Sequence, residues 1–283
     1  MRLFILPNLK LATAPECTRQ VIGRLRGCGL TPLLEESTAA ALDITEVMTG
    51  TADQLLPFCD ALIAIGGDGA IFHSAIDALR YSKPILGINS GRLGFLSQLE
   101  AGDLSPLERL KSGDYSIMNR MVLRVRTHGM ADEVRYAIND VVMSRSHLGR
   151  IIDLEVRCGD QLVGIYRADG LIFATPTGST AYSLSAGGPI VDPSVESILM
   201  TPTCPHSLYN RSIVFSSDKR LSVRPTMPSR EERLFIAVDG QELPSGGAVD
   251  CVTIDKSEYV SRFICFDDRN FYQTLNQKLK LRG

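Results

Sequence analysis

The near-continuous apolar run from Asp60 to Ile65 ends in Gly66-Gly67-Asp68-Gly69, and this junction constrains the fold more than any other stretch. An apolar run of this length bounded by glycines is typical of a buried strand. Apolar residues then recur at helical spacing from Ile71 to Leu79, before a strand expected at Pro84 to Ile88. The junction is therefore a sharp turn from a strand into a helix.

The residues before this junction follow the same alternation. A strand is expected at Leu3 to Leu6, helical spacing runs from Pro15 to Cys28, and a weaker strand follows at Thr31 to Leu34. Strand, helix, strand, helix, strand predicts an open, mostly parallel α/β sheet. We expect an α/β N-terminal domain over residues 1–114.

After Gly113 the pattern changes to short segments rich in β-formers, several of them alternating. Strands are expected at 116–126, 134–143, 151–156, 161–166, 212–215, 221–223, 234–238, 249–254 and 259–266. They predict a β-rich C-terminal domain over residues 115–266. Beyond it, Phe271, Leu275 and Leu279 lie at i, i+4 and i+8, which predicts an amphipathic C-terminal helix within residues 267–283, with Asp267 and Asp268 as capping candidates.

Composition narrows the class of protein. The 283 residues are 44% hydrophobic and 22% charged, so the chain can bury a large core in one or two domains. Its 30 basic and 32 acidic residues give a formal charge of −2, which argues against a nucleic-acid partner because nonspecific binding needs a basic field. No run approaches the roughly 18 apolar residues of a membrane span. Seven Cys residues without a C-x-x-C pair favour reduced thiols and a cytoplasmic location, and argue against zinc.

The glycines of the junction suit an anion. They let backbone N–H groups approach a phosphate, and the helix N-terminus adds a favourable field. Asp68 would repel that ligand, so it needs a role: holding a metal that bridges the phosphates, or accepting a proton from a hydroxyl that attacks a phosphoryl group. The alternative is a tight turn in which Asp68 caps the helix. The junction matches neither the dinucleotide pattern G-x-G-x-x-G nor the P-loop.

A second block, from Arg167 to Pro189, places a loop dense with hydroxyls and glycine after an apolar strand at Leu171 to Ala174. A short helix is expected near Ser179 and ends at the glycines before Pro189. Hydroxyls, backbone amides and the Tyr182 ring can together bond the ribose, base edge and phosphates of a nucleotide. Ordinary capping and turn chemistry is the alternative, but it does not explain the whole density of polar groups.

Two further polar positions stand out. Asn89 follows a strand end, where ligands bind in open α/β sheets, and Phe95 after it is either a base-stacking ring or a core residue. Asn139-Asp140 lies inside a strand-like run, so it is either a satisfied buried pair or a binding pair. The four His residues show no ligand spacing, so we predict no dedicated metal-ligating residues, and G-x-S-x-G is absent.

Taken in order, these blocks resemble the NAD kinase family. The resemblance rests on Gly66-Gly67-Asp68-Gly69, Gly91-Arg-Leu-Gly-Phe-Leu96, Asn139-Asp140, the block at 169–189 and Val238-Asp239-Gly-Gln241, and it covers nearly the whole chain. It implies an α/β N-terminal domain, a β-rich C-terminal domain and a C-terminal helix that returns to the first domain. It also implies transfer of the γ-phosphoryl group of ATP, or of polyphosphate, to the 2′-hydroxyl of the adenosine ribose of NAD, assisted by a divalent ion such as magnesium.

The resemblance assigns roles by position. Asp68 looks like the general base, while Gly66, Gly67 and Gly69 resemble the phosphate-facing turn. Residues similar to those that bind the nucleotides are Asn89, Phe95, Asn139, Asp140, Arg150, Arg167, Asp169, Thr180, Ala181, Tyr182, Ser185, Asp239 and Gln241. The family also implies a homodimer or homotetramer. Two alternatives stay open: a lipid or sugar kinase that shares the G-G-D-G turn, and a noncatalytic NAD(H)-sensing module.

Overall fold

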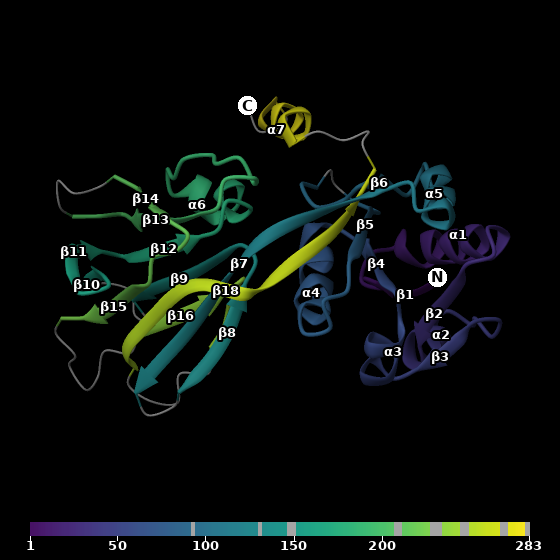
Figure 1. Ribbon diagram of the computed structural model, residues 1–283, viewed down its shortest axis with the longest axis horizontal. Coiled ribbons are helices and arrows are strands. Elements are labelled where there is room, and N and C mark those ends of the chain that lie inside the picture. The colour runs from purple at the N-terminus through teal and green to yellow at the C-terminus, as the bar shows by residue number, and fades with distance from the viewer. Residues whose placement is uncertain are drawn as a thin grey trace. The chain divides into compact units, whose positions relative to one another are not determined.

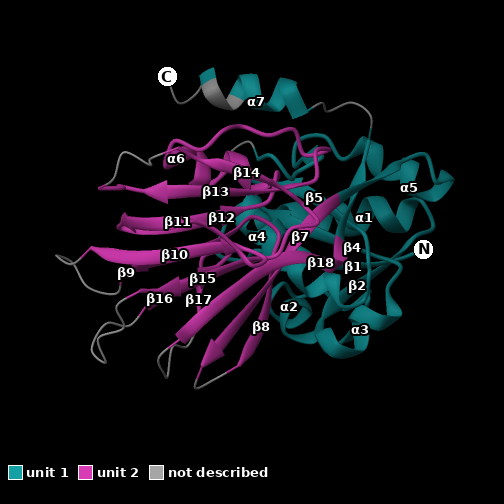
Figure 2. Cartoon of the chain, turned by 60° about the vertical axis from the view of Figure 1, so that its left-hand side comes forward, with its two compact units in different colours: residues 1–119, 261–283 teal, residues 120–260 magenta. Residues whose placement is uncertain are grey.

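A computed structural model describes residues 1–91, 94–129, 132–145, 151–206, 211–226, 234–243, 249–266 and 271–280. The chain forms two compact units, of which unit 1 comprises residues 1–119 and 261–283 and unit 2 comprises residues 120–260 (Figure 2). The chain passes from unit 1 to unit 2 within the long strand β7 (Ser116–Gly129) and returns within β18 (Val249–Cys265).

Unit 1 alternates strands with helices, as Figure 1 shows along its N-terminal part. Its elements are β1 (Arg2–Pro7), α1 (Ala14–Gly27), β2 (Thr31–Glu35), α2 (Glu36–Ala41), β3 (Met48–Gly50), α3 (Ala52–Phe58), β4 (Ala61–Gly66), α4 (Asp68–Leu79), β5 (Ile85–Asn89), β6 (Leu99–Glu100), η1 (Ser105–Glu108), α5 (Arg109–Ser112) and α7 (Phe271–Lys280). The strands lie in the order β5-β4-β1-β2-β3, and every neighbouring pair is parallel. The last part of β18 adds to this sheet beside β5.

This strand order has one reversal, between β1 and β4. The chain winds from β1 outward to β3 and then returns to place β4 on the other side of β1. In open α/β sheets, ligands bind outside the carboxyl ends of the strands at such a switch point. The turn after β4 lies at that position, and it contains Gly67 and Asp68.

The core of unit 1 explains why its central strands read as apolar. All six residues of β4 are buried, and α1 places Cys17, Val21 and Leu25 in the same hydrophobic cluster as Leu3 of β1. The α/β prediction is therefore confirmed, with every expected element of this region present within one to three residues. Strand β3 and the short helices α2, α3 and α5 were not predicted, because they have too few residues to show a period.

Unit 2 is built almost entirely of strands. Besides parts of β7 and β18 it contains β8 (Glu133–Ala137), β9 (Asp140–Arg145), β10 (Ile152–Cys158), β11 (Gln161–Ala168), β12 (Gly170–Ala174), η2 (Gly178–Thr180), α6 (Tyr182–Ser185), β13 (Ser197–Thr203), β14 (Ile213–Ser216), β15 (Leu221–Pro225), β16 (Leu234–Val238) and β17 (Gln241–Glu242). One sheet has the order β14-β13-β12-β9-β16-β17, and β11-β10-β15-β18 with β7 and β8 form the other. Inward residues of both, such as Phe173 and Val252, share one core, so unit 2 is a sandwich.

Three boundaries in the β-rich part differ from expectation. The strand predicted at 134–143 is interrupted at Ile138 and Asn139, which separate β8 from β9. The two strands predicted at 249–254 and 259–266 are one strand, β18. Strand β13 was not predicted, because its Thr and Pro residues break the apolar pattern. The C-terminal helix is present as α7, while its capping candidates Asp267 and Asp268 lie outside the described residues.

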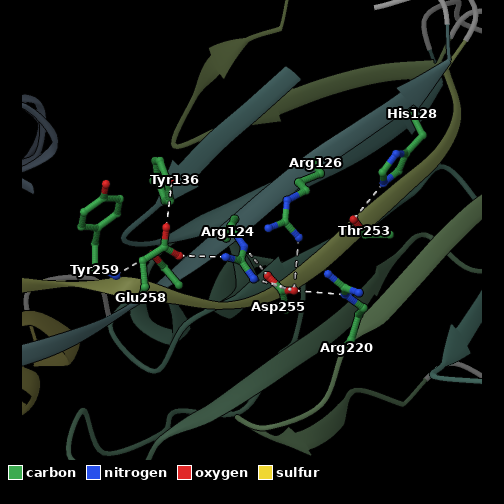
Figure 3. A network of polar contacts seen from close by, with 10 residues as sticks. Arg124, Arg126, His128, Tyr136, Arg220, Thr253, Asp255, Glu258 and Tyr259 are labelled. Atoms are coloured by element: carbon green, nitrogen blue, oxygen red, sulfur yellow. Dashed lines mark hydrogen bonds and ion pairs between the residues drawn. The ribbon is translucent and has the colours of Figure 1, made fainter. Parts of the chain in front are cut away.

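The outer face of the sheet that contains β7, β15 and β18 carries charged side chains. Arg124 of β7 donates to both carboxylate oxygens of Asp255 on β18, at 2.8 and 3.0 Å, and Arg220 donates to the same group at 3.1 Å (Figure 3). Arg126 lies 3.6 Å from Asp255, and Arg124 also reaches Glu258 at 2.9 Å. Burial would raise the pKa of Asp255, but the hydrogen bonds from Arg124 and Arg220 outweigh it and hold that pKa below its ordinary value.

Candidate functional site

The first group of site residues lies at the carboxyl end of β4. Asn8, which follows β1, donates its backbone N–H to the Ile65 carbonyl at 2.8 Å, so the two strand ends are joined. A Cβ on Gly66 would stand 2.8 Å from the Ala70 Cβ and 3.2 Å from the Asn8 Cβ. Glycine is required at position 66 because the turn closes tightly around it.

Gly67 and Gly69 are glycines for a different reason. A Cβ on either would meet no heavy atom of the described residues within 4 Å, and neither backbone has a positive φ. The packing of the described chain therefore permits a side chain at both positions. Their lack of one leaves the backbone N–H groups at the start of α4 open to close approach, which suits an anion.

Asp68 is the first residue of α4, and its carboxylate points away from that helix. Gly67 holds the N-cap position, while Asp68 accepts hydrogen bonds from the backbone N–H groups of Phe95 at 2.9 Å and Leu96 at 3.2 Å. A Cβ on Gly94 would stand 2.0 Å from Asp68 Oδ1, so glycine at 94 makes this contact sterically feasible. The alternative in which Asp68 caps its own helix is wrong.

Asn89 and Phe95 lie in the same unit. Asn89 is 3% exposed, and its Nδ2 donates to Glu100 Oε2 at 2.6 Å while its Oδ1 accepts the Gly91 N–H at 3.0 Å. Its amide therefore shapes the turn after β5. The half-buried Phe95 ring lies 6.3 Å from the ring of Phe271 in α7. The nucleotide contacts predicted for Asn89 and Phe95 stay predictions.

The second group of site residues lies in unit 2, where Asn139 precedes β9 and Asp140 is its first residue. The carboxylate of Asp239 accepts the backbone N–H groups of Ile138, Asn139 and Asp140 at 2.8, 2.9 and 3.0 Å. Asp239 in turn donates its own N–H to the Asp140 carbonyl at 2.9 Å. The predicted pair therefore stands in a backbone turn built around one carboxylate.

Asp140 is a buried acid, only 6% exposed. Burial and the charge of Asp239 raise its pKa to about 7, and the backbone N–H of Tyr182 acts in the opposite direction. A carboxyl group with such a pKa changes its charge near neutral pH. It can then accept a hydrogen bond as an anion or donate one when protonated.

The loop after β12 holds the same turn from its other side. Thr175 donates its hydroxyl to the Ile138 carbonyl at 2.5 Å and its N–H to the Asn139 carbonyl at 2.8 Å. A Cβ on Gly178 would stand 2.2 Å from the Asn139 carbonyl oxygen, so glycine is required at 178. Residues 138–140 are thus clamped between Asp239 and this loop.

The hydroxyl-rich block separates into internal and outward groups. Ser179 exchanges hydrogen bonds with Val191, Thr180 donates to the Thr177 carbonyl at 3.3 Å, and Ser183 shares a hydrogen bond with Thr201. These contacts fit the capping and turn alternative. Tyr182, however, is 50% exposed, Ser185 is exposed, and Ala181 is half-buried. Among the predicted site residues at 180–185, Tyr182, Ser185 and Ala181 therefore have surface to offer a ligand.

Of the remaining predicted residues, Asp169 lies away from this cluster and Gln241 lies near it. Asp169 precedes β12 and pairs with Arg145 at 3.1 Å, roughly 15 Å along the strand from the end next to Asp140. The Arg167 side chain is 65% exposed and lies 4.0 Å from Asp153. Exposed Gln241 begins β17, two residues after Asp239. Arg150 lies outside the described residues.

The sequence does not predict the structural importance of three residues: Gly94, Thr175 and Gly178. The two glycines lie inside the quoted motifs, but nothing in their spacing names the Asp68 carboxylate or the Asn139 carbonyl as their neighbour. Thr175 lies in the hydroxyl-dense block, but nothing in its spacing names the Ile138 carbonyl as its partner. Such contacts join segments far apart in the chain, so only the fold reveals them.

Among the residues that it describes, the structure shows neither a cluster of metal-ligating side chains nor a membrane-spanning helix. Among the residues that the structure describes, no three His, Cys, Asp or Glu side chains gather in a way that would hold a metal ion. A divalent ion held mainly by substrate phosphates needs only one or two protein carboxylates, and Asp68 fits that demand. In the described part of the chain, no helix is long and apolar enough to cross a membrane.

Comparison with known families gives two matches. The ATP-NAD kinase N-terminal domain matches residues 29–114, and the ATP-NAD kinase C-terminal domain matches residues 138–266. The NAD kinase of Caldanaerobacter subterraneus subsp. tengcongensis is 40% identical over 281 residues, which cover 98% of each chain. The NAD kinase of Symbiobacterium thermophilum is 39% identical, with 92% of each chain covered.

Solved structures share the fold. A yeast NADH kinase complexed with NADH superposes with a TM-score of 0.89 at 24% identity, covering 99% of this chain and 87% of the yeast chain. An NAD kinase from Archaeoglobus fulgidus in complex with ATP gives a TM-score of 0.75 at 24% identity, covering 99% of both chains. At this level of identity the likeness concerns architecture, namely an α/β part followed by a β-rich part.

Proposed function

Because the chain belongs to the ATP-NAD kinase family, we propose that it transfers the γ-phosphoryl group of ATP to the 2′-hydroxyl of the adenosine ribose of NAD, giving NADP. The family matches cover most of the chain, and the curated relatives are matched over nearly their whole length. The yeast and Archaeoglobus structures bind NADH and ATP respectively, and we extend both ligand classes to this chain.

The observation that carries the proposal is the position of Asp68. Its carboxylate stands at the switch point of the unit 1 sheet, fixed by the N–H groups of Phe95 and Leu96. A fixed carboxylate there can accept the proton of an attacking hydroxyl. Gly67 and Gly69 leave the neighbouring N–H groups of α4 open to phosphate oxygens. Positioning and charge stabilisation are what phosphoryl transfer requires of a protein.

We assign the acceptor ribose to the clamped turn in unit 2. Asn139 offers an amide and Asp140 a carboxyl group, and both can bond ribose hydroxyls. Tyr182 and Ser185 expose a ring and a hydroxyl for the adenosine. Magnesium bound to ATP would neutralise part of the phosphate charge, and Asp68 is the carboxylate at the phosphate-facing turn that could contact it. We further propose that polyphosphate can serve as an alternative donor and NADH as an alternative acceptor. We also propose a homodimeric or homotetrameric assembly and a cytoplasmic location.

The deciding experiment measures NADP formation from NAD, ATP and magnesium with an NADP-specific dehydrogenase. Asp68→Asn should lower kcat by about 10² to 10⁴, the usual contribution of a general base, while NAD binding measured by calorimetry changes little. The matched control is Asp77→Asn, which makes the same change at an exposed position on the same helix and should leave kcat unaltered.

Other results separate the alternatives. Phosphorylation of a diacylglycerol or a sugar phosphate instead of NAD would identify a lipid or sugar kinase. NAD binding without NADP formation, with either ATP or polyphosphate, would identify a sensing module. Near-normal turnover in Asp68→Asn would remove Asp68 from the chemistry. Light scattering and cell fractionation test the assembly and the location.

A further inference from the structure

Asp239 lies in a tight turn between two strands. It follows β16 and precedes Gly240 and β17, and its φ of +50° is in the left-handed region, which Asp and Asn adopt more readily than most residues. Its carboxylate accepts three consecutive backbone N–H groups, those of Ile138, Asn139 and Asp140.

This pattern is incompatible with a strand. Successive N–H groups of a strand point to opposite sides, so three in a row cannot reach one carboxylate unless the strand is interrupted. The interruption between β8 and β9 is at Ile138 and Asn139. The sequence of residues 134–143 favours one continuous strand. We attribute the break to Asp239, because it gathers the N–H groups that a strand would disperse.

The interruption between β8 and β9 determines the positions of Asn139 and Asp140, the pair that we assign to the ribose. Residue Asn139 stands outside both strands, and Asp140 begins β9 with its side chain buried beside the Tyr182 N–H. In a continuous strand these two side chains would alternate across the sheet faces instead. The direction in which Asn139 and Asp140 present their polar atoms therefore depends on Asp239.

Asp239 also acts on Asp140 through its charge. Among the described residues, Asp239 is the charged group that acts on the Asp140 carboxyl, and the Tyr182 backbone N–H is the opposing dipole. Burial and this negative neighbour together raise the pKa of Asp140 to about 7. Removing the charge of Asp239 therefore lowers the pH at which Asp140 ionises.

We propose that Asp239 is a positioning residue of the acceptor site, which acts on NAD through the backbone of residues 138–140 and through Asp140 rather than by direct contact. This inference rests on the proposed function. It replaces the substrate contact that the family resemblance implies for Asp239 with an indirect role, carried by the hydrogen bonds that its carboxylate accepts from residues 138–140.

The test is Asp239→Asn. Asparagine tolerates the left-handed backbone and has the same size, but its NH₂ group faces at least one N–H donor that the carboxylate had accepted. We expect the KM for NAD to rise about tenfold or more, which is the loss of one buried hydrogen bond expressed as affinity, and the KM for ATP to stay within about twofold. In the wild type the KM for NAD should change near pH 7, and in Asp239→Asn that change should move to lower pH.

Two comparisons keep the result specific. Asp218→Asn makes the same substitution in the exposed turn between β14 and β15 and should change neither the KM for NAD nor its pH profile. Asp140→Asn removes the titrating group and should abolish the break near pH 7. Amide hydrogen exchange at residues 138–140 should become faster in Asp239→Asn and not in Asp218→Asn, whether or not the protein is active.

The outcomes are distinguishable. If Asp239→Asn is folded by circular dichroism and keeps the wild-type KM for NAD and pH profile, the positioning role is wrong. If both KM values rise equally, Asp239 supports the whole fold and the specific role is also overturned. Absence of NADP formation in the wild type would defeat the proposed function, while hydrogen exchange would still decide whether Asp239 holds the turn.

Discussion

Gly178 lies directly against the carbonyl oxygen of Asn139, since a Cβ on Gly178 would stand 2.2 Å from that oxygen. The obstructing atoms are backbone, so they cannot move aside as a side chain can. Gly178→Ala should therefore lower the free energy of unfolding by about 1 to 3 kcal/mol and displace the Asn139 turn. Thermal unfolding and the KM for NAD measure the two effects, and the KM should rise.

The matched control is Gly164→Ala in β11. A Cβ there would meet its nearest neighbour, the Tyr166 ring, at 3.4 Å, which is an ordinary contact. Alanine also suits a strand interior better than glycine. Gly164→Ala should leave stability and the KM for NAD unchanged, and a stable, fully active Gly178→Ala would contradict the close packing described for Asn139.

Gly69→Ala should lower activity without lowering stability, in contrast to Gly178→Ala. Position 69 is the second residue of α4 and has open space around it among the described residues, so alanine should keep the free energy of unfolding or raise it by up to about 1 kcal/mol. Activity should nevertheless fall at least tenfold, on the order of 1.4 kcal/mol in transition-state binding, because a methyl group would obstruct phosphate approach to the N–H groups. Thermal unfolding and kcat/KM for ATP are the measurements.

Two other glycines make this result interpretable. Gly23 in α1 has equally open surroundings, so Gly23→Ala should bring the same stability change with unaltered activity. Gly66→Ala should lose stability, because its Cβ would stand 2.8 Å from the Ala70 Cβ. An active, stable Gly69→Ala enzyme would show that this face of the turn does not receive phosphates.

The parts of the fold that the sequence predicts are those governed by local pattern. The apolar run at 60–65 predicts β4 and the helical spacing at 71–79 predicts α4, because the pattern of apolar residues decides both elements, and the amphipathic C-terminal pattern predicts α7. The same pattern fails at residues 134–143. There, local preference favours one strand, and a carboxylate about a hundred residues later breaks it.

The candidate site shows the same division. The G-G-D-G turn was evident from its position between a strand and a helix, but the donors that fix Asp68, at Phe95 and Leu96, come from another segment. Likewise, the spacing of hydroxyls in the 175–185 block does not reveal that Thr180 faces inward while Tyr182 is half exposed. Residue type indicates the chemistry, but only long-range contacts determine which atoms are available for it.

Asp255→Asn should destabilise the protein through the charge network of Figure 3. The Asp255 side chain is 15% exposed and neutralises three arginines, of which Arg124 is 22% exposed and Arg220 is 59% exposed. Breaking a fully buried pair costs more, so with partial solvent screening we expect a loss of about 1 to 3 kcal/mol by urea unfolding.

The dependence of this loss on pH and salt identifies its cause. The folded-state pKa of Asp255 is below its ordinary value, so its contribution is present above that ordinary value and disappears as the pH falls through the folded-state pKa. The difference between wild type and Asp255→Asn should therefore vanish in acid and shrink in about 1 M salt. Glu258→Gln, at a side chain that is 53% exposed, should cost less than about 1 kcal/mol, and an equal cost would contradict the central role of Asp255.

Asp140→Asn should change how stability depends on pH. The Asp140 pKa is about 7 in the folded protein against an ordinary value of 3.8, so the folded state binds this proton more tightly than the unfolded state does. The stabilisation from that proton is complete below the ordinary value and is lost as the pH rises through 7, to a limit of about 4 kcal/mol. Relative to wild type, Asp140→Asn should therefore be more stable at pH 8 than at pH 5, measured by urea unfolding at both. If the difference between the two proteins were the same at both pH values, Asp140 would be ionised throughout, and burial beside Asp239 would not govern its charge.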